Sequence, residues 1–210
     1  TTNGMLDAYL VKIDKNGNLQ WTQNYGGAQD DRSFDVVVEG NNEFVVFGDT
    51  KSFGTGNGQT DFWLFKTQAL VLPSPGNDLV INKTHGGTNT DRASDLHLTS
   101  DGGYLINGFT QSFGSGNQDA WLLKADNNGN FVWNRTYGGA GDDRGLSVIE
   151  DSSNNIVSMA RIERVGETSG NISLIKRDSN GNLIWDRNYT TNDGNANGVV
   201  IESLDGDYAF

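Results

Sequence analysis

THGGTNTDRASDLHLTSDGGYLINGFTQSFGSGNQDAWLLKADNNGNFVWNRT, residues 84–136, is the stretch that decides the fold, because most of it recurs earlier and later in the chain. A Tyr-Gly-Gly type of anchor stands at Tyr25, His85 and Tyr137, and Tyr189 holds the same place in a fourth copy. The anchors are 60, 52 and 52 residues apart, and the longer step reflects extra residues before Asp61 and within 68–77. Such internal periodicity indicates a repeat architecture.

Each copy contains four short strand-like runs, which in the quoted stretch are residues 94–99, 104–110, 120–125 and 131–137. Apolar and polar residues alternate in the first run, as expected for a half-buried strand. Asp-Gly and Asn-Gly dipeptides separate the runs, and these dipeptides tolerate the positive φ angles that tight hairpins require. Each copy therefore predicts a four-stranded antiparallel meander.

Four-stranded meanders that repeat in this way are typical of β-propeller blades, whereas solenoid repeats are usually shorter. The expected fold is all-β, with a period of about 52 residues, and residues 1–210 form one β-propeller or an arc of a larger one. Its expected parts are a half blade at 7–25, blades at 33–86, 93–138 and 145–189, and a half blade at 197–210.

The two half blades allow two arrangements. They could pair with each other and close a four-bladed ring, or the segment could belong to a propeller of about seven or eight blades. We favour the larger ring, because a chain that ends within a strand leaves unpaired sheet edges.

The repeat motifs resemble those of secreted bacterial and archaeal β-propeller proteins. The motifs that carry the resemblance are SFGSGNQDAWL at 112–122, NGN at 128–130 and YGGAGDDR at 137–144. The resemblance covers essentially the whole chain and concerns the fold, since propellers host many unrelated functions. It implies an extracellular or cell-surface location, within a large exported protein that a type IX secretion pathway delivers.

Composition narrows the range of partners. The formal net charge of −12 and the pI near 4.4 argue against nucleic acid and anionic membrane surfaces as partners. The apolar runs are all of strand length, so we expect no membrane insertion. The chain contains no cysteine, which excludes a disulfide framework and a thiol nucleophile.

Parity assigns the loops to two faces, because alternate loops of an up-and-down meander lie on the same side. The loops that follow the Tyr-Gly-Gly anchors and the Ser-Phe-Gly loops therefore share one face, and the short turns share the other. Long and varied loops mark the face where a ligand is expected. The ligand-face candidates are Asp31, Arg32, Phe53, Asp91, Arg92, Phe113, Asp143, Arg144, Arg161 and Arg164.

Recurrence favours a structural role for most of these residues. An Asp-Arg pair occurs at 31–32, 91–92 and 143–144, and its carboxylate is expected to accept backbone N–H groups of the next blade while the Arg bridges to it. Each Ser-Phe-Gly phenylalanine is expected to fill a gap between blades. Catalysis is not expected, because an active site is built once and these motifs recur. The charged loop at 161–171 is a candidate for specific recognition.

Aromatic pairs recur on the fourth strand of each copy. Trp21 with Tyr25, Trp133 with Tyr137 and the pair at 185 and 189 have the same parity and point to one face. Packing between neighbouring blades is the expected role of these rings. A row of rings for carbohydrate stacking is the alternative.

The motifs provide little support for a metal or cofactor. The Asp-x-Asn-Gly-Asn segments at 14–18, 126–130 and 178–182 resemble part of a calcium loop, but their glycine is fourth rather than sixth and no glutamate closes the site. Hairpin turns explain them better, and calcium is the alternative. His85 and His97 are not part of a histidine cluster, so the sequence predicts no zinc site.

These observations favour a binding or scaffolding module that recognises a protein or a glycan in adhesion, and not an enzyme. A first alternative is a glycoside hydrolase or polysaccharide lyase whose acidic residues, for example Asp31, Asp35 and Asp95, converge at the ring centre. A second alternative is a structural spacer of a large adhesin.

Overall fold

A computed structural model describes residues 5–40, 43–55, 59–67, 79–163, 171–190 and 197–210. All of the helices and strands assigned in these ranges are β-strands. They are β1 (Ala8–Ile13), β2 (Leu19–Tyr25), β3 (Asp31–Glu39), β4 (Glu43–Thr50), β5 (Asp61–Thr67), β6 (Leu79–His85), β7 (Asp91–Leu98), β8 (Tyr104–Thr110), β9 (Asp119–Ala125), β10 (Phe131–Tyr137), β11 (Arg144–Glu150), β12 (Ile156–Ile162), β13 (Asn171–Arg177), β14 (Leu183–Thr190), β15 (Ile201–Glu202) and β16 (Tyr208–Ala209).

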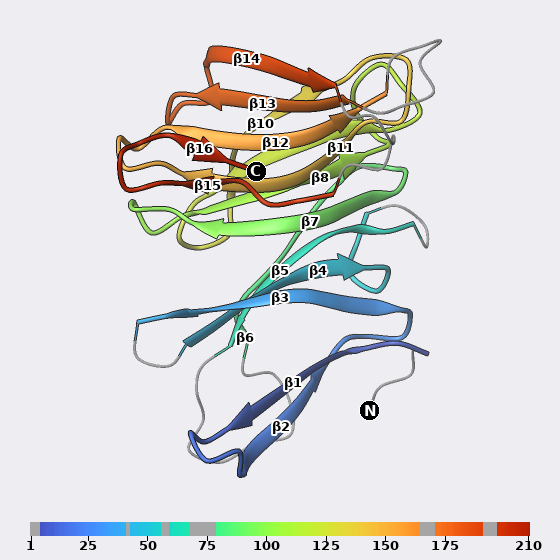
Figure 1. Ribbon diagram of the computed structural model, residues 1–210. Coiled ribbons are helices and arrows are strands. Elements are labelled where there is room, and N and C mark those ends of the chain that lie inside the picture. Colours follow the sequence, from blue (N-terminus) through green and yellow to red (C-terminus); the bar gives the residue numbers. More distant parts are fainter. Residues whose placement is uncertain (1–4, 41–42, 56–58, 68–78, 164–170, 191–196) are drawn as a thin grey trace.

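The strands form three four-stranded antiparallel meanders and two hairpins. The complete sheets are β3–β6, β7–β10 and β11–β14, and β1–β2 and β15–β16 are separate two-stranded sheets. Figure 1 shows β1–β2 at the bottom, β3–β6 above it, and β7–β10 and β11–β14 in the upper part of the view, with β15–β16 drawn below β14. The predicted all-β, four-stranded repeat is therefore confirmed, and the half blades expected at the two ends are not paired with each other.

The predicted strand bounds agree closely with the structure. β8 and β10 have the expected limits, whereas β7 begins at Asp91 rather than at residue 94. The earlier start has a physical reason, because Asp91 already lies opposite Thr110 in the ladder with β8. The Asn-Gly turns have φ values of +86° at Gly17, +73° at Gly129 and +77° at Gly181, a region that favours glycine.

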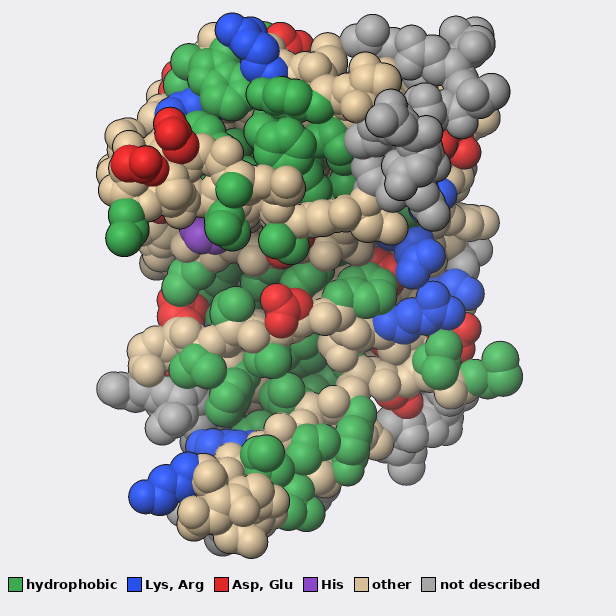
Figure 2. All heavy atoms as spheres, viewed as in Figure 1, with side chains coloured by type: hydrophobic (Ala, Val, Ile, Leu, Met, Phe, Trp, Pro, Cys, Tyr) green, Lys and Arg blue, Asp and Glu red, His purple; other side chains and the backbone are tan. Residues whose placement is uncertain are grey.

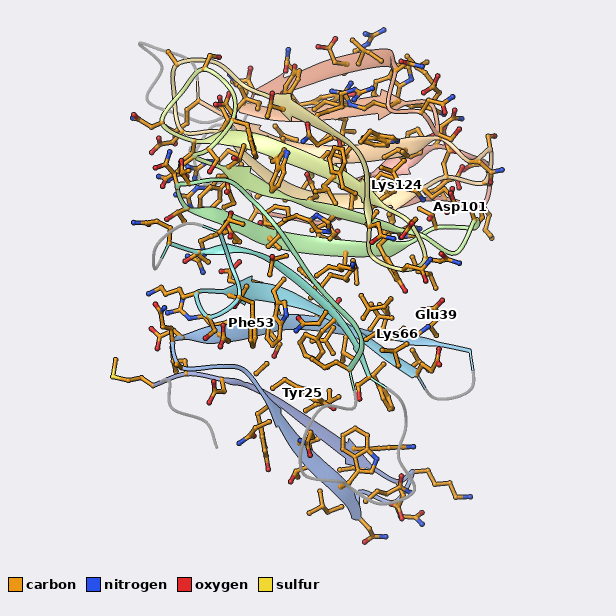
Figure 3. All side chains as sticks on the ribbon, turned by 180° about the vertical axis from the view of Figure 1, so that it is seen from behind. Tyr25, Glu39, Phe53, Lys66, Asp101 and Lys124 are labelled. Atoms are coloured by element: carbon orange, nitrogen blue, oxygen red, sulfur yellow. The ribbon has the colours of Figure 1, made fainter. Side chains whose placement is uncertain are left out.

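The core lies between neighbouring sheets. Phe62 of β5 packs against Trp121 of β9 with ring centroids 4.5 Å apart, and both side chains are fully buried. Tyr25 of β2 packs on Phe65 of the following sheet, and its hydroxyl is 2.8 Å from Thr67 Oγ1 (Figure 3). The predicted role of the recurring Trp and Tyr residues in packing between successive sheets is confirmed for this pair.

The other predicted aromatic pairs pack in the same direction. Trp133 contributes to a cluster with Val148 and Ile156 of the next sheet, and Tyr137 to one with Ala160 and Ile162. β2 and β10 thus carry aromatic rings that pack their sheets against the following ones. Within the described ranges no helix is long and apolar enough to cross a membrane.

Candidate functional site

The longer loops gather on one face of the molecule, as parity predicts. The backbone N–H of Gln29, in the loop between β2 and β3, donates to Ser52 Oγ at 2.9 Å, and Asn89 makes the same bond to Ser112 at 3.0 Å. We call this side the long-loop face; it comprises the loops between β2 and β3, β4 and β5, β6 and β7, β8 and β9, and β10 and β11. It lies at the right in Figure 1.

The recurring aspartates of the Asp-Arg pairs are fully buried and form latches. The Asp31 carboxylate accepts hydrogen bonds from Thr50 Oγ1 at 2.5 Å, Ser52 Oγ at 2.7 Å and the Gly27 N–H at 2.7 Å. These donors belong to the loops and strand end of its own sheet, so the expectation that they come from the next blade is wrong. A carboxylate at the start of the first strand reaches the end of the adjacent second strand more readily than a separate sheet.

The latches nevertheless touch the preceding sheet through the backbone. The N–H of Asp31 donates to Leu6 O at 2.8 Å, that of Asp91 to Thr60 O at 2.6 Å, and that of Asp143 to Gln118 O at 2.8 Å. The same residue thus closes its own loops with the carboxylate and ties two sheets with its main chain. This explains why it recurs in three copies.

Two of the three arginines of the pairs, Arg92 and Arg144, bridge to the preceding sheet, and they do so with different partners. Arg92 Nε donates to Asp49 Oδ2 on β4 at 2.7 Å, and the Ala93 N–H donates to Asp49 Oδ1 at 3.2 Å. Arg144 lies over the ring of Phe109, 5.2 Å from its centroid, and donates to Gln118 Oε1 at 2.9 Å. The residue at the position shared by Asp49 and Phe109 therefore determines whether a junction contains a carboxylate.

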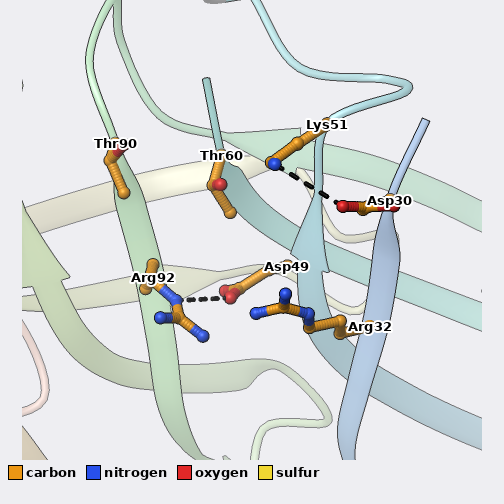
Figure 4. Close-up of a pocket in the computed structure, with 7 residues that line it drawn as sticks. All are labelled: Asp30, Arg32, Asp49, Lys51, Thr60, Thr90 and Arg92. Carbon is orange, nitrogen blue, oxygen red and sulfur yellow. Dashed lines mark hydrogen bonds and ion pairs between the residues drawn. The ribbon is translucent and has the colours of Figure 1, made fainter. Parts of the chain in front are cut away.

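A cleft of about 230 Å³ opens on the long-loop face where the β3–β6 and β7–β10 sheets meet. Figure 4 shows the Arg32 and Arg92 guanidinium groups directed at Asp49 from opposite sides. Figure 2 shows Lys and Arg side chains gathered at the same height on the right edge. The residues that line the cleft are Asp30, Arg32, Asp49, Lys51, Thr60, Thr90 and Arg92.

The cleft has an excess of positive charge in a chain whose net charge is −12. Its lining contains three cationic and two acidic side chains. Arg92 pairs with Asp49, and Lys51 Nζ is 3.6 Å from Asp30 Oδ2. The Arg32 guanidinium is exposed and makes no hydrogen bond or ion pair with the described residues. It is the cation that a ligand could engage without displacing a protein partner.

Asp49 is the buried titratable group of the cleft, with a side chain only 4% exposed. Burial raises the pKa of Asp49 to about 6, although the hydrogen bond and the charge of Arg92, the Ala93 N–H and the charge of Arg32 all act in the opposite direction. The net charge of the cleft therefore becomes more positive as the pH falls below neutrality.

The other predicted site residues lie elsewhere on the long-loop face. Phe53 packs on Trp63 and Phe113 on Trp121, each with centroids 5.5 Å apart and each within one sheet, and these contacts leave the expected filling of gaps between blades a prediction. Arg161 pairs with Glu163 at 2.7 Å, and the candidate at position 164 lies outside the described residues.

The acidic trio considered for an enzyme does not gather at one point. Asp31 is committed to its latch. Asp95 accepts the N–H groups of Val148 at 2.8 Å and Leu96 at 3.0 Å, and burial raises its pKa, with a smaller contribution from the charge of Asp35. The structure thus brings Asp35 and Asp95 into electrostatic contact without Asp31.

The calcium-like segments are hairpin turns stabilised by their own aspartate. The Asp14 carboxylate accepts the N–H groups of Asn16 and Asn18 at 2.8 Å each, and the Asn18 amide at 2.9 Å. Equivalent bonds form at Asp126 and Asp178. No group of three or more acidic or histidine residues arranged for a metal ion is found in the described part of the chain.

Sequence reasoning missed the residue at the centre of the cleft. Asp49, Phe109 and Arg161 occupy the same position of successive copies, opposite Arg32, Arg92 and Arg144 in their ladders. The signal was present as a departure from the repeat, since GDTKSFG at 48–54 stands where GFTQSFG stands at 108–114. Only the packing of two sheets reveals that this departure creates a buried carboxylate.

Comparison with known proteins provides information on the fold alone. Neither a family model nor a curated protein matches the sequence. A solved structure of a Bacteroides caccae protein of unknown function is similar over 92% of this chain, with a TM-score of 0.50 and 8% sequence identity. This chain covers 57% of that protein, so it spans less than two thirds of the neighbour's length.

Proposed function

We propose that this chain is a secreted or cell-surface β-propeller, or an arc of one, that acts as a binding module for an acidic glycan. The binding site is the cleft between the β3–β6 and β7–β10 sheets. The observation that carries the proposal is the Arg32 guanidinium, which has no hydrogen bond or ion pair with the described residues and lies across a small polar cleft from Arg92, with Asp49 between them. The surface location rests on the repeat resemblance and on the acidic composition.

The propeller is supported by the way the meanders pack. The first strand of a sheet lies against the inner strands of the preceding sheet, since β7 contacts β3, β4 and β5, and β11 contacts β7, β8 and β9. Repetition of the same contact along the chain generates an arc with the first strands on its inner side. The clefts between sheets then open on one rim of the arc, together with the long loops.

The chemistry of the lining favours a carboxylate-bearing sugar. A planar guanidinium binds a carboxylate in a bidentate manner, and Lys51 adds a further positive charge beside it. The hydroxyl groups of Thr60 and Thr90 can exchange hydrogen bonds with sugar hydroxyls. A protein partner would require an apolar pocket for a large anchor residue, and the lining of this cleft is polar.

The next junction provides a natural comparison. At the second junction, Phe109 and Gln111 hold the positions that Asp49 and Lys51 hold in the cleft. Arg144 lies over the Phe109 ring and donates a hydrogen bond to Gln118. A specific site is expected once in a molecule, whereas a latch recurs. The cleft at the first junction meets this criterion.

Binding of an oligogalacturonate, measured by isothermal titration calorimetry at pH 7, tests the proposal. Arg32→Met is expected to weaken binding at least about tenfold, since a charge-assisted bidentate pair is lost. Arg32 makes no hydrogen bond or ion pair with the described residues, so the fold should tolerate the change. Arg144→Met is the matched control at the equivalent position and should bind like the parent.

A neutral oligosaccharide of the same length serves as the second control. Equal affinity for the neutral and acidic sugars would overturn the proposal, and so would equal losses in Arg32→Met and Arg144→Met. A protein ligand would appear as an absence of binding to both sugars, which would also overturn the assignment of the cleft to an acidic glycan.

A further inference from the structure

A small polar cavity lies inside the molecule, between the β7–β10 and β11–β14 sheets. Its volume is about 10 Å³, which is room for one water molecule or one monatomic ion. Both sheets contribute to its wall, which is partly aliphatic. The polar residues of the wall are Asn107, Arg135, Tyr137, Ser158 and Arg177.

Two arginines converge at this cavity from the two sheets. Arg135 Nε donates to Gly181 O at 2.9 Å and Arg177 Nη1 donates to the same oxygen at 3.4 Å, so the two guanidinium groups share one acceptor. The other hydrogen bonds of Arg135 go to the backbone oxygens of Asn134 and Asn180. Neither arginine forms an ion pair with a carboxylate of the described residues. Two like charges therefore lie close together without an acidic partner.

Arg177 is the buried member of the pair, with 8% of its surface exposed. Its Nε–H is buried and has no hydrogen-bond partner among the residues that the structure describes. Burial and the charge of Arg135 lower the pKa of Arg177, whereas Tyr137 and Asp186 act in the opposite direction. Asp186 already accepts the Tyr137 hydroxyl at 3.1 Å. Because an arginine keeps its proton inside a protein, the cavity wall contains a buried cation with an unused donor.

The same space at the first junction, between the β3–β6 and β7–β10 sheets, is apolar. Phe62 holds there the position of Ala120, and its ring packs on Trp121. Ala125, which is fully buried, holds the position of Arg177. The polar cavity with its two cations thus departs from the repeat, as expected of a ligand site and not of a recurring structural contact.

We propose that this cavity binds a single chloride ion, which accepts the Arg177 Nε–H and lies in the positive field of Arg135. Ser158 can supply a further donor, because its hydroxyl makes only a long contact of 3.5 Å with Ile175 O. An anion compensates the buried positive charge, which a water molecule does not do. The small volume favours a monatomic ion over sulfate, phosphate or a carboxylate.

The site should couple chloride to stability, because the cavity exists only when the two sheets are packed. At about 100 mM chloride, a site with a dissociation constant of about 1 mM should raise the thermal midpoint by about 5 °C. Circular dichroism at pH 7 measures the midpoint in sodium chloride and in an equal concentration of sodium methanesulfonate, whose anion is too large for the cavity. Arg177→Met should abolish the shift. Arg187→Met is the matched control, since Arg187 holds the position of Arg135 in the next copy and is exposed, and it should keep the shift.

A crystal grown in sodium bromide provides a test that needs no variant. Bromide replaces chloride and scatters anomalously, so an anomalous peak is expected in the cavity, within hydrogen-bonding distance of Arg177 Nε. An ordered water without anomalous signal would overturn the proposal, and so would equal midpoints of the parent in the two sodium salts. A chloride shift that survives in Arg177→Met and disappears in Arg32→Met would also overturn it, because the ion would then lie in the glycan cleft.

Discussion

The two junctions between complete sheets are built from the same repeat and differ where a ligand could enter. Both contain a buried aspartate latch and an arginine that crosses to the preceding sheet. At the first junction the arginine meets Asp49, and at the second it covers Phe109. The shared part holds the sheets together, and the part that varies sets the charge of the cleft.

The two arginine contacts also differ in how much stability is lost when the arginine is removed. A cation over an aromatic ring at a partly exposed site contributes about 0.5–1 kcal/mol and leaves no buried charge behind when it is removed. A buried carboxylate paired with one arginine is different, because loss of the partner leaves the charge uncompensated. The first junction therefore depends more strongly on its arginine than the second does, and it contains a titratable polar cleft.

The largest expected effect is on the free energy of unfolding, and it comes from removing a buried aspartate latch. Asp31→Ala and Asp91→Ala should each lower the free energy of unfolding by about 4 kcal/mol, because two hydroxyl groups and one backbone N–H lose a buried acceptor. Urea denaturation measures the loss. Asp30→Ala removes a surface pair with Lys51 and should cost less than about 0.5 kcal/mol. Asp31 lies where β3 meets the β1–β2 hairpin and Asp91 at the first junction between complete sheets, so a marked difference between the two variants would show that the latch is not equivalent in successive copies.

Much of this shared part was predictable from the sequence. The hairpin turns and the strand order follow from local alternation, because each depends on neighbours within one copy. The packing role of Tyr25 and Tyr137 between sheets follows from the recurrence of aromatic residues at the same positions of successive copies. The donors to Asp31 were assigned to the wrong sheet, since strand pairing and sheet packing both bring loops to the same face.

The second prediction distinguishes the two junctions by the stability that each loses when its arginine is removed. Arg92→Met should lower the free energy of unfolding by about 3 kcal/mol at pH 7, because Asp49 keeps its burial and loses its ion-pair partner. Arg144→Met should cost about 1 kcal/mol, since only stacking on Phe109 and one hydrogen bond disappear. Urea denaturation of the two variants at the same pH measures the difference.

The pH dependence of the Arg92→Met deficit provides the control. Burial places the pKa of Asp49 at about 6 in the folded protein, above its ordinary value of 3.8. The folded state therefore takes up a proton that the unfolded state does not hold, and the resulting stability is complete below about pH 4 and lost as the pH rises through 6. The deficit of Arg92→Met should shrink as the pH falls from 7 to 4, whereas that of Arg144→Met should not change. Equal and pH-independent deficits would contradict the role of Asp49.

The cleft itself could not be predicted from one copy. Asp49 is separated from Arg92 by 43 residues and belongs to another sheet, so their proximity arises only when two sheets pack. The sequence carries the clue as an exception, because the repeat has Asp, Phe and Arg at positions 49, 109 and 161. Comparison of the copies can therefore locate a variable position, but its burial and its partner depend on the tertiary structure.

The smallest expected effect is on ligand affinity, and it tests the contribution of a single group, the Asp49 carboxylate. Asp49→Asn removes the negative charge between Arg32 and Arg92, and should strengthen oligogalacturonate binding at pH 7 about fivefold, a gain of about 1 kcal/mol at the effective dielectric of a protein surface. The parent should approach the affinity of the variant as the pH falls from 7 to 5, because Asp49 gains a proton while the sugar carboxylates stay ionised. Titration calorimetry at pH 5, 6 and 7 measures both curves. A parent whose affinity does not change over this range, or a variant that binds more weakly at pH 7, would show that the carboxylate of Asp49 does not oppose the ligand and that the anion binds elsewhere.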